Sequence, residues 1–417
     1  MTMGPKSLDK KAALLTVFLV VLVDLMGFGI VLPLLPFYAS KFNASPVLIG
    51  LLYSVYSFAQ LIFSPIWGGW SDKIGRRPIM LMSTLGSVLS YVLFAFSRSL
   101  ALLFFSRLLA GVMGGNISTA QAYVADVTSE ENRAKGMGLI GAAFGIGFVM
   151  GPALSSLLIL PAVQQMCSNS ALPGASFVSQ NKFFIPGLVA AFLSLTSFVL
   201  VCLKLPETVH KSEQEDPSRI RRVSVFSFRF WKSLSDAKAQ YLPLFLLSGL
   251  ILAVGQSSLY SAFPLYCKKI LSLAPEKVGL LFVWMGVVAI VIQGGAIRVL
   301  VKRFGEKKLF LVGNFLLTIG LLLLPFSLNE KALAGALAVM GVGASLNGPT
   351  LNSLISKTAS PKEMGRTLGS AQSLSALGRV IGPTWGGWLF TFSPRVPFFL
   401  TAAVVFITVI VGFKIQD

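Results

Sequence analysis

Runs of about 20 apolar residues recur along the whole chain, and this repetition restricts the possible folds more than any other feature. An α-helix needs about 20 such residues to cross the hydrocarbon core of a bilayer. The runs that meet this length lie approximately at 13–37, 47–70, 78–97, 100–123, 137–159, 183–204, 241–266, 277–300, 308–326, 332–355, 367–391 and 397–414. The sequence therefore predicts an all-α membrane protein with twelve transmembrane helices.

The composition excludes the soluble classes. Hydrophobic residues form 54% of the 417 residues and charged residues only 12%, with a mean hydropathy of +0.77. A soluble domain carries roughly a quarter of its residues charged. The longest hydrophilic stretch, from about Lys204 to Gln240, is too short to fold as a domain of its own. Three cysteines and one histidine are too few for a disulfide framework or a metal centre, so no cofactor is expected.

Positive charge is distributed unevenly between the loops. The formal net charge is +19, which in a soluble protein would raise the question of nucleic acid. If the N-terminus is inside, the inner segments hold 25 of the 35 Lys and Arg residues and the outer loops hold 8. The positive-inside rule then places both termini in the cytoplasm. The charge is a signal of topology and a contact for lipid headgroups, and we expect the cell membrane (inner or plasma) as the location and no nucleic acid as a partner.

The two halves of the sequence repeat one another. The segment NISTAQ at 116–121 aligns with NGPTLN at 347–352, and the same offset of 231 carries Gly147 onto Gly378. A parallel duplication of six helices produces two pseudo-symmetric bundles with a cavity between them, an architecture suited to alternating access. The predicted parts are an N-terminal six-helix bundle at 1–204, a cytoplasmic linker at 205–240 and a C-terminal six-helix bundle at 241–417.

The loop after the second run carries the motif GGWSDKIGRRP at residues 68–78. Glycines allow helices to approach closely, and charged side chains here can bind neighbouring helix ends. The alternative is a basic loop that only follows the positive-inside rule. The density of the match resembles the loop motif of the major facilitator superfamily. This resemblance implies that Arg76 pairs with Asp126, although Asp126 can also be a solvated acid at a helix end. The predicted cytoplasmic gate comprises Gly69, Asp72, Gly75, Arg76, Arg77 and Asp126.

Further motifs are similar to the drug:proton antiporter branch of that family, including bacterial tetracycline-efflux and multidrug-efflux transporters. They are DLMGFGIVLPLLP at 24–36, RLLAG at 107–111 and the glycine-proline pattern of span 5, which recurs in span 11. The glycines predict a seam or hinge where helices pack closely, formed by Gly147, Gly151, Pro152, Gly378, Gly382 and Pro383. Spans 3 and 9 lack the carboxylates of the tetracycline exporters, so transport of a metal-chelated drug is not expected.

Asp24 is the one acidic residue deep within a predicted span. An ionised carboxylate at that depth costs several kcal/mol unless it is paired. Asp24 is therefore the predicted group that couples transport to protons. The alternative is a structural ion pair with Arg107 or Arg379.

Polar side chains at membrane depth are few, and at least half are expected to join helices rather than contact a substrate. Gln256 and Tyr260 lie one turn apart on one helix face. Because two deep arginines face a single aspartate, the cavity attracts anions, and we predict an acidic substrate. The candidates for the substrate cavity are Arg107, Gln256, Tyr260, Arg379, Asn116 and Asn347.

The sequence lacks the motifs of other membrane machines. It has no metal-ligand set, no nucleophile beside a base, no phosphate-binding loop and no ring of like groups for an ion filter. We therefore predict a monomeric secondary transporter and not an enzyme, exporting a small organic molecule in exchange for protons. Its partners are the substrate, protons and membrane lipids, and the proton gradient is the driving force. Proton-coupled or passive uptake of a metabolite, and a receptor or scaffold without transport activity, stay open as alternatives.

Overall fold

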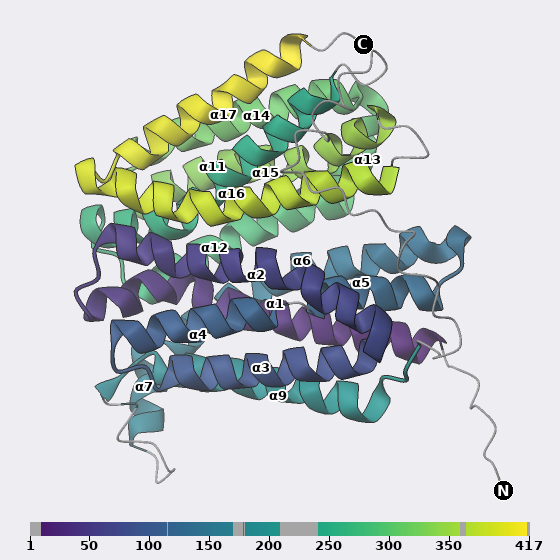
Figure 1. Cartoon of the computed structure of the whole chain (residues 1–417). Helices are drawn as coiled ribbons and strands as arrows, with labels where there is room; N and C mark the ends of the chain where they lie inside the picture. The colour runs from purple at the N-terminus through teal and green to yellow at the C-terminus, as the bar shows by residue number, and fades with distance from the viewer. Residues whose placement is uncertain are drawn as a thin grey trace, which may run out of the picture. The chain divides into compact units, whose positions relative to one another are not determined.

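The computed structural model describes residues 10–114, 116–169, 178, 180–208, 241–358 and 364–414. Within these residues the regular structure is entirely helical (Figure 1). In chain order the helices are α1 (Lys10–Lys41), α2 (Pro46–Ile74), α3 (Arg76–Ala95), α4 (Leu100–Met113), α5 (Asn116–Val127), α6 (Glu130–Leu158), α7 (Pro161–Ser168), α9 (Phe184–Lys204), α11 (Leu242–Ile270), α12 (Pro275–Val291), η3 (Ile292–Ala296), α13 (Ile297–Phe304), α14 (Glu306–Leu323), η4 (Leu324–Phe326), α15 (Glu330–Thr358), α16 (Met364–Phe392) and α17 (Val396–Lys414).

Eleven helical segments in the described part of the chain are long and apolar enough to cross a membrane. The all-helical membrane class is therefore confirmed. The predicted span at 367–391 lies in α16, which is long enough but carries several serines, Gln372 and Arg379 and is too polar to join the eleven. A crossing by α16, and with it the count of twelve, stays a prediction, as does the cytoplasmic position of the termini.

Contacts between residues divide the chain into two compact units. Unit 1 comprises residues 1–34 and 59–217, and unit 2 comprises residues 35–58 and 218–417. The predicted division into bundles at 1–204 and 241–417 stays a prediction. Residues 209–240 of the predicted linker lie outside the described residues.

Unit 1 is built around a core of small and branched apolar side chains. Helix α3 packs against α9 and α4, and α5 packs against α6 (Figure 1). The buried cluster includes Val17 and Val21 of α1, Tyr123 and Val124 of α5, and Val201 of α9. Because lipid is as apolar as these side chains, close packing rather than the hydrophobic effect holds such helices together.

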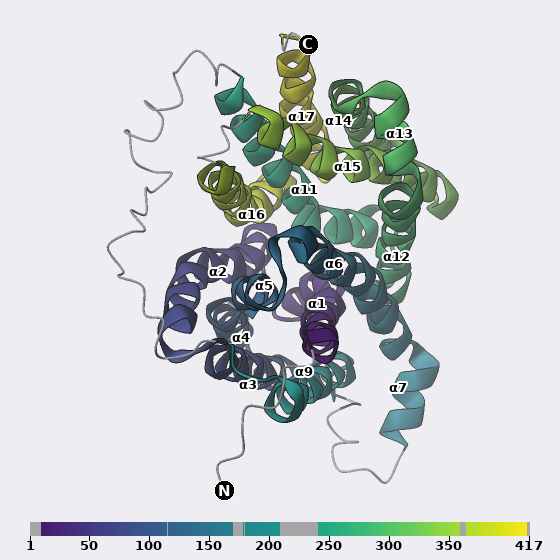
Figure 2. The same cartoon turned by 90° about the vertical axis from the view of Figure 1, so that its right-hand side faces the viewer.

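In unit 2, α11 packs along α16, and α14 packs between α15 and α17 (Figure 2). The segment 35–58, the end of α1 and the start of α2, belongs to the same unit. Ser54 donates a hydrogen bond from Oγ to the Val380 carbonyl at 2.5 Å, and its Oγ lies 2.7 Å from Thr384 Oγ1. A serine of α2 therefore forms hydrogen bonds with a backbone carbonyl and a threonine side chain of α16.

The fourth predicted span falls within one of the eleven candidate segments, Leu100–Val127, which comprises α4 and α5. Helix α4 ends at Met113 with Gly114 as its C-cap, and α5 begins at Asn116. Side chains of α2 and α3 bind the carbonyl groups at the end of α4. Trp67 Nε1 donates to Val112 at 2.5 Å, and Gln60 Nε2 donates to Gly114 at 3.3 Å. Ser83 donates to the Met113 carbonyl.

The glycine-proline pattern of α6 lies against α1. A methyl group at Gly147 would lie 2.6 Å from Leu25 Cβ. One at Gly151 would lie 2.6 Å from Gly29 Cα, a separation too short for any side chain. The backbones of α1 and α6 therefore approach as closely as glycine permits.

The repeat reproduces this contact between α11 and α16. A methyl group at Gly378 would lie 2.6 Å from Ala253 Cβ, and one at Gly382 would collide with Ser257 Oγ. Ser257 donates to the Gly378 carbonyl at 3.1 Å, and Ser261 donates to the Pro383 carbonyl at 2.7 Å. The second copy of the seam is thus stabilised by hydrogen bonds as well as by packing.

We predict that Gly151→Val destabilises unit 1, because its side chain collides with the α1 backbone and overpacking costs typically ~1–3 kcal/mol. The measurement is the apparent melting temperature of the protein purified in detergent. Gly145→Val is the matched control, since no atom lies within 4 Å of a methyl group at that position of α6. Equal melting temperatures for the two variants would show that the seam does not limit stability.

Candidate functional site

Arg107, one of the predicted cavity residues, is buried, with 3% of its surface exposed. Its guanidinium carbon lies 5.1 Å from the centroid of the Phe94 ring and 5.7 Å from that of Tyr91. A cation over an aromatic face is attracted by the ring quadrupole. Two rings of α3 therefore hold the Arg107 side chain in place, a role that a flexible lysine would not match.

Asp24 is half-buried on α1. Gly27 follows it by three residues, so the two lie on the same face of α1. A methyl group at Gly27 would lie 2.8 Å from the Tyr91 hydroxyl, and Tyr91 in turn contacts Arg107. The face of α1 that carries Asp24 therefore packs, through Gly27, against the tyrosine that contacts Arg107.

Unit 2 contains a second group of predicted cavity residues. Tyr260 and Gln256 are half-buried on α11, and Tyr260 interacts electrostatically with Arg379 of α16. The Tyr260 ring lies 6.1 Å from the ring of Tyr53, which α2 contributes to the same unit. Gln256 is placed one turn before Tyr260 on the same face. The charge of Arg379 thus acts on a tyrosine of the same unit.

The two predicted amides are placed differently. Asn347 is 1% exposed in the contact between α15 and α14, where its Oδ1 would collide with a methyl group at Gly313. The neighbouring Asn314 of α14 is fully buried. Asn116 begins α5, but its side chain lies outside what the structure describes.

Arg76 brings the predicted gate residues together at the start of α3. Its Nε donates to Asp126 Oδ2 at 3.0 Å, and its Nη1 binds Asp72. The same Nη1 donates to Ser71 Oγ at 2.7 Å. The Arg76 side chain is 11% exposed. Its partner Asp126 is 32% exposed and its partner Asp72 is 57% exposed, so the ion pair with Asp126 is better shielded from solvent. Gly69 lies on α2 one turn before Lys73, and it is half-buried.

Glu207 stabilises the start of α3 and was not identified by the sequence analysis. Its carboxylate accepts from the Arg76 backbone N–H at 2.9 Å and from the Arg77 N–H at 3.1 Å. These are the first N–H groups of α3, which have no partner within a helix. Gly75, with φ of 109°, makes the turn before them. The sequence did contain a signal for this contact. Glu207 is an acid shortly after the predicted span 183–204, and Arg76 and Arg77 form a basic helix start. Arg77 also donates to the Cys202 carbonyl at 2.6 Å.

The second repeat carries an ion pair at the equivalent position with its charges reversed. Offsets of 230 and 231 carry Arg76 onto Glu306 and Asp126 onto Lys357. Lys357 Nζ donates to Glu306 Oε1 at 2.6 Å. The first half therefore places the cation at the helix start, whereas the second half places the anion there.

The described residues contain no group of three or more His, Cys, Asp or Glu side chains that could hold a metal ion.

Comparison with known families places these features in context. The model of the Major Facilitator Superfamily matches the chain over residues 17–300 and again over residues 245–416. Tetracycline resistance protein, class E, of Escherichia coli is 28% identical over 391 residues, which cover 89% of each chain. Multidrug resistance protein 2 of Bacillus subtilis is 26% identical over 406 residues, covering 94% of this chain and 93% of the relative.

Solved structures show the same fold. The human organic anion transporter MFSD10 (TETRAN) superposes with a TM-score of 0.68 at 24% identity, covering 97% of this chain and 100% of that chain. A bacterial homologue of the human lysosomal transporter Spinster, in an inward-facing and occupied conformation, gives a TM-score of 0.78 at 14% identity, covering 98% and 97%. At these identities the likeness shows the fold alone.

We predict that Glu207→Gln weakens the start of α3, because the charged cap of two backbone N–H groups is lost and a helix cap contributes about 1 kcal/mol. The apparent melting temperature in detergent measures the effect. Glu330→Gln is the control, since that carboxylate pairs with Lys277 and both side chains are 52% exposed. A surface pair contributes little. Equal losses in the two variants would contradict the role of Glu207.

Proposed function

Because this chain belongs to the major facilitator superfamily, we propose that it is a secondary active transporter that moves a small organic anion by alternating access, using a proton gradient. The family consists of transporters rather than enzymes, and its fold is present here. Proton coupling, the direction of transport and the nature of the substrate are the parts that we propose.

The observation that carries the proposal is the buried guanidinium of Arg107, held between two aromatic rings. A positive charge fixed in a medium of low dielectric constant attracts an anion much more strongly than a charge in water. Arg379, which interacts electrostatically with Tyr260, supplies a second cation in unit 2. Arginine also matches the planar geometry of a carboxylate with two parallel donors. MFSD10, a relative with the same fold, is named an organic anion transporter.

Asp24 is the proposed coupling residue. It lies half-buried in α1, on the face whose Gly27 packs against Tyr91, and Tyr91 contacts Arg107. Protonation of Asp24 removes a negative charge from the unit that holds Arg107, which changes the affinity of the site for an anion. A proton and a substrate that act on the same charges are thermodynamically linked.

The Arg76 cluster is the proposed cytoplasmic gate, holding the cytoplasmic ends of the helices when the cavity opens outward. Its bonds join α2, α3 and α5 within unit 1. Removing one partner leaves the others partly desolvated, at a cost of about 1–3 kcal/mol, and such a cost shifts an equilibrium between two conformations.

Export in exchange for protons is the proposed direction, and it is supported by relatives named as tetracycline and multidrug resistance proteins. The charges themselves favour a second candidate, inward co-transport of an anion with a proton. A carboxylate at Asp24 competes with an anionic substrate for the arginines, so protonation would favour substrate binding. The sign of proton movement on binding separates the two candidates.

We predict that Asp24→Asn abolishes accumulation driven by a pH gradient while substrate binding persists, because the amide keeps the shape of the side chain but cannot exchange a proton. Fluorescein uptake or release by proteoliposomes with an imposed pH gradient, with and without a protonophore, measures this. Glu276→Gln, which removes an acid from the first turn of α12, is the control and should transport normally. Accumulation against a gradient by Asp24→Asn would rule out this role.

We also predict that organic anions compete for the site and lipophilic cations do not. Benzoate and fluorescein should displace one another from the purified protein, whereas tetraphenylphosphonium should displace neither. Arg107→Gln should lose anion binding, and Arg107→Lys should retain it with lower affinity, since the charge persists without the planar fork. Competition by tetraphenylphosphonium alone would contradict the charge argument.

A further inference from the structure

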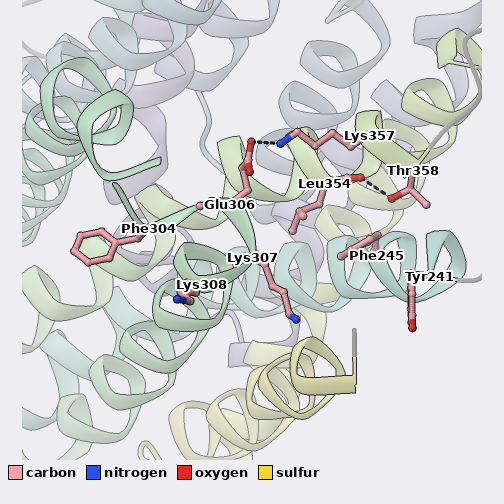
Figure 3. A pocket seen from close by; sticks show the side chains of 10 residues that line it. Tyr241, Phe245, Phe304, Glu306, Lys307, Lys308, Leu354, Lys357 and Thr358 are labelled. Carbon is pink, nitrogen blue, oxygen red and sulfur yellow. Dashed lines mark hydrogen bonds and ion pairs between the residues drawn. The ribbon is translucent and has the colours of Figure 1, made fainter. Parts of the chain in front are cut away.

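Unit 2 contains a cavity of about 480 Å³ where α11 and α14 begin and α15 ends (Figure 3). Its position is the α13–α14 turn, which the charge distribution predicts to be cytoplasmic. None of the residues predicted for substrate transport line it. The lining residues are Tyr241, Phe245, Phe304, Gly305, Glu306, Lys307, Lys308, Leu354, Lys357 and Thr358.

Positive charge predominates in this cavity. Three lysines line it against a single acid, Glu306, which is already engaged by Lys357. Figure 3 shows Lys357 of α15 next to Glu306, and Lys307 and Lys308 follow Glu306 on the first turn of α14. The start of a helix carries a partial positive charge and N–H groups without partners inside the helix. The lysine side chains and the helix start therefore both attract an anion.

The first repeat shows what this geometry binds. The equivalent helix start, at α3, holds the Glu207 carboxylate on two backbone N–H groups. In both repeats a glycine with positive φ precedes the helix, Gly75 at 109° and Gly305 at 78°. The same turn that binds a carboxylate in unit 1 thus borders an open, lysine-lined cavity in unit 2.

We propose that this cavity binds the phosphate of an anionic phospholipid headgroup. The cavity combines cationic side chains with apolar walls from Phe245 and Leu354, and it lies at the ends of membrane helices, where headgroups are located. Basic pockets between transmembrane helices on the cytoplasmic side suit such lipids. Lys307 and Lys308 hold the phosphate, and the bound lipid stabilises the start of α14 as Glu207 stabilises the start of α3.

The test follows the melting temperature of the full-length protein in detergent. It is titrated with dioleoylphosphatidylglycerol, with dioleoylphosphatidylcholine, or with inorganic phosphate. We expect stabilisation by the anionic lipid only. The variant Lys307→Gln/Lys308→Gln should lose at least half of that increase. The control Lys302→Gln/Arg303→Gln removes the same charge from the end of α13, outside the cavity lining, and should keep it.

Three outcomes would overturn the proposal. They are equal loss in both double variants, full retention in the Lys307→Gln/Lys308→Gln variant, and the same stabilisation by inorganic phosphate alone, which would identify a free anion as the ligand. A second measurement covers a variant that fails to fold. Wild-type protein is crosslinked with a photoactivatable phosphatidylglycerol and the modified peptides are mapped. Adducts at 304–308 and 354–358 support the site, and adducts confined to other segments contradict it.

Discussion

Charge is costly inside a bilayer, and the rest of this structure depends on how the chain limits and places it. Only Asp24, Arg107 and Arg379 carry charge deep within the predicted spans. Arg107 is buried against two aromatic rings, and Arg379 interacts with Tyr260. Glycine seams bring helices together on the remaining surface, and in the second repeat serine hydroxyls add hydrogen bonds to the packing. In the function that we propose, the three deep charges determine what the transporter recognises.

At the helix ends the same cost is met by pairing. Arg76 binds two acids in the first repeat, and Glu306 binds Lys357 in the second. The ion pair lies at the same position in both repeats, but the acidic and basic residues have exchanged places. One consequence is that the α3 start is neutralised by Glu207, whereas the α14 start borders a basic cavity. The two repeats thus have different partners at equivalent helix starts.

Much of the fold could be predicted from the sequence, because the length and hydropathy of a transmembrane helix are local properties. The contact of Arg76 with Asp126 was expected from the motif, and the structure shows the two in contact. The hydrogen bonds of Trp67, Gln60 and Ser83 to the carbonyl groups at the end of α4 were not predicted, since the donors come from other helices. The Glu207 cap was also missed, because it joins residues about 130 positions apart. Such contacts depend on packing, which no local pattern encodes.

The central claim is that protons and an anionic substrate act on one set of charges. Its most direct test is proton movement when fluorescein binds to the purified protein in weakly buffered detergent solution. We predict a net proton exchange that disappears in Asp24→Asn, with release indicating exchange for protons and uptake indicating co-transport. Fluorescein binding without proton movement at any pH between 5 and 9 would contradict the account.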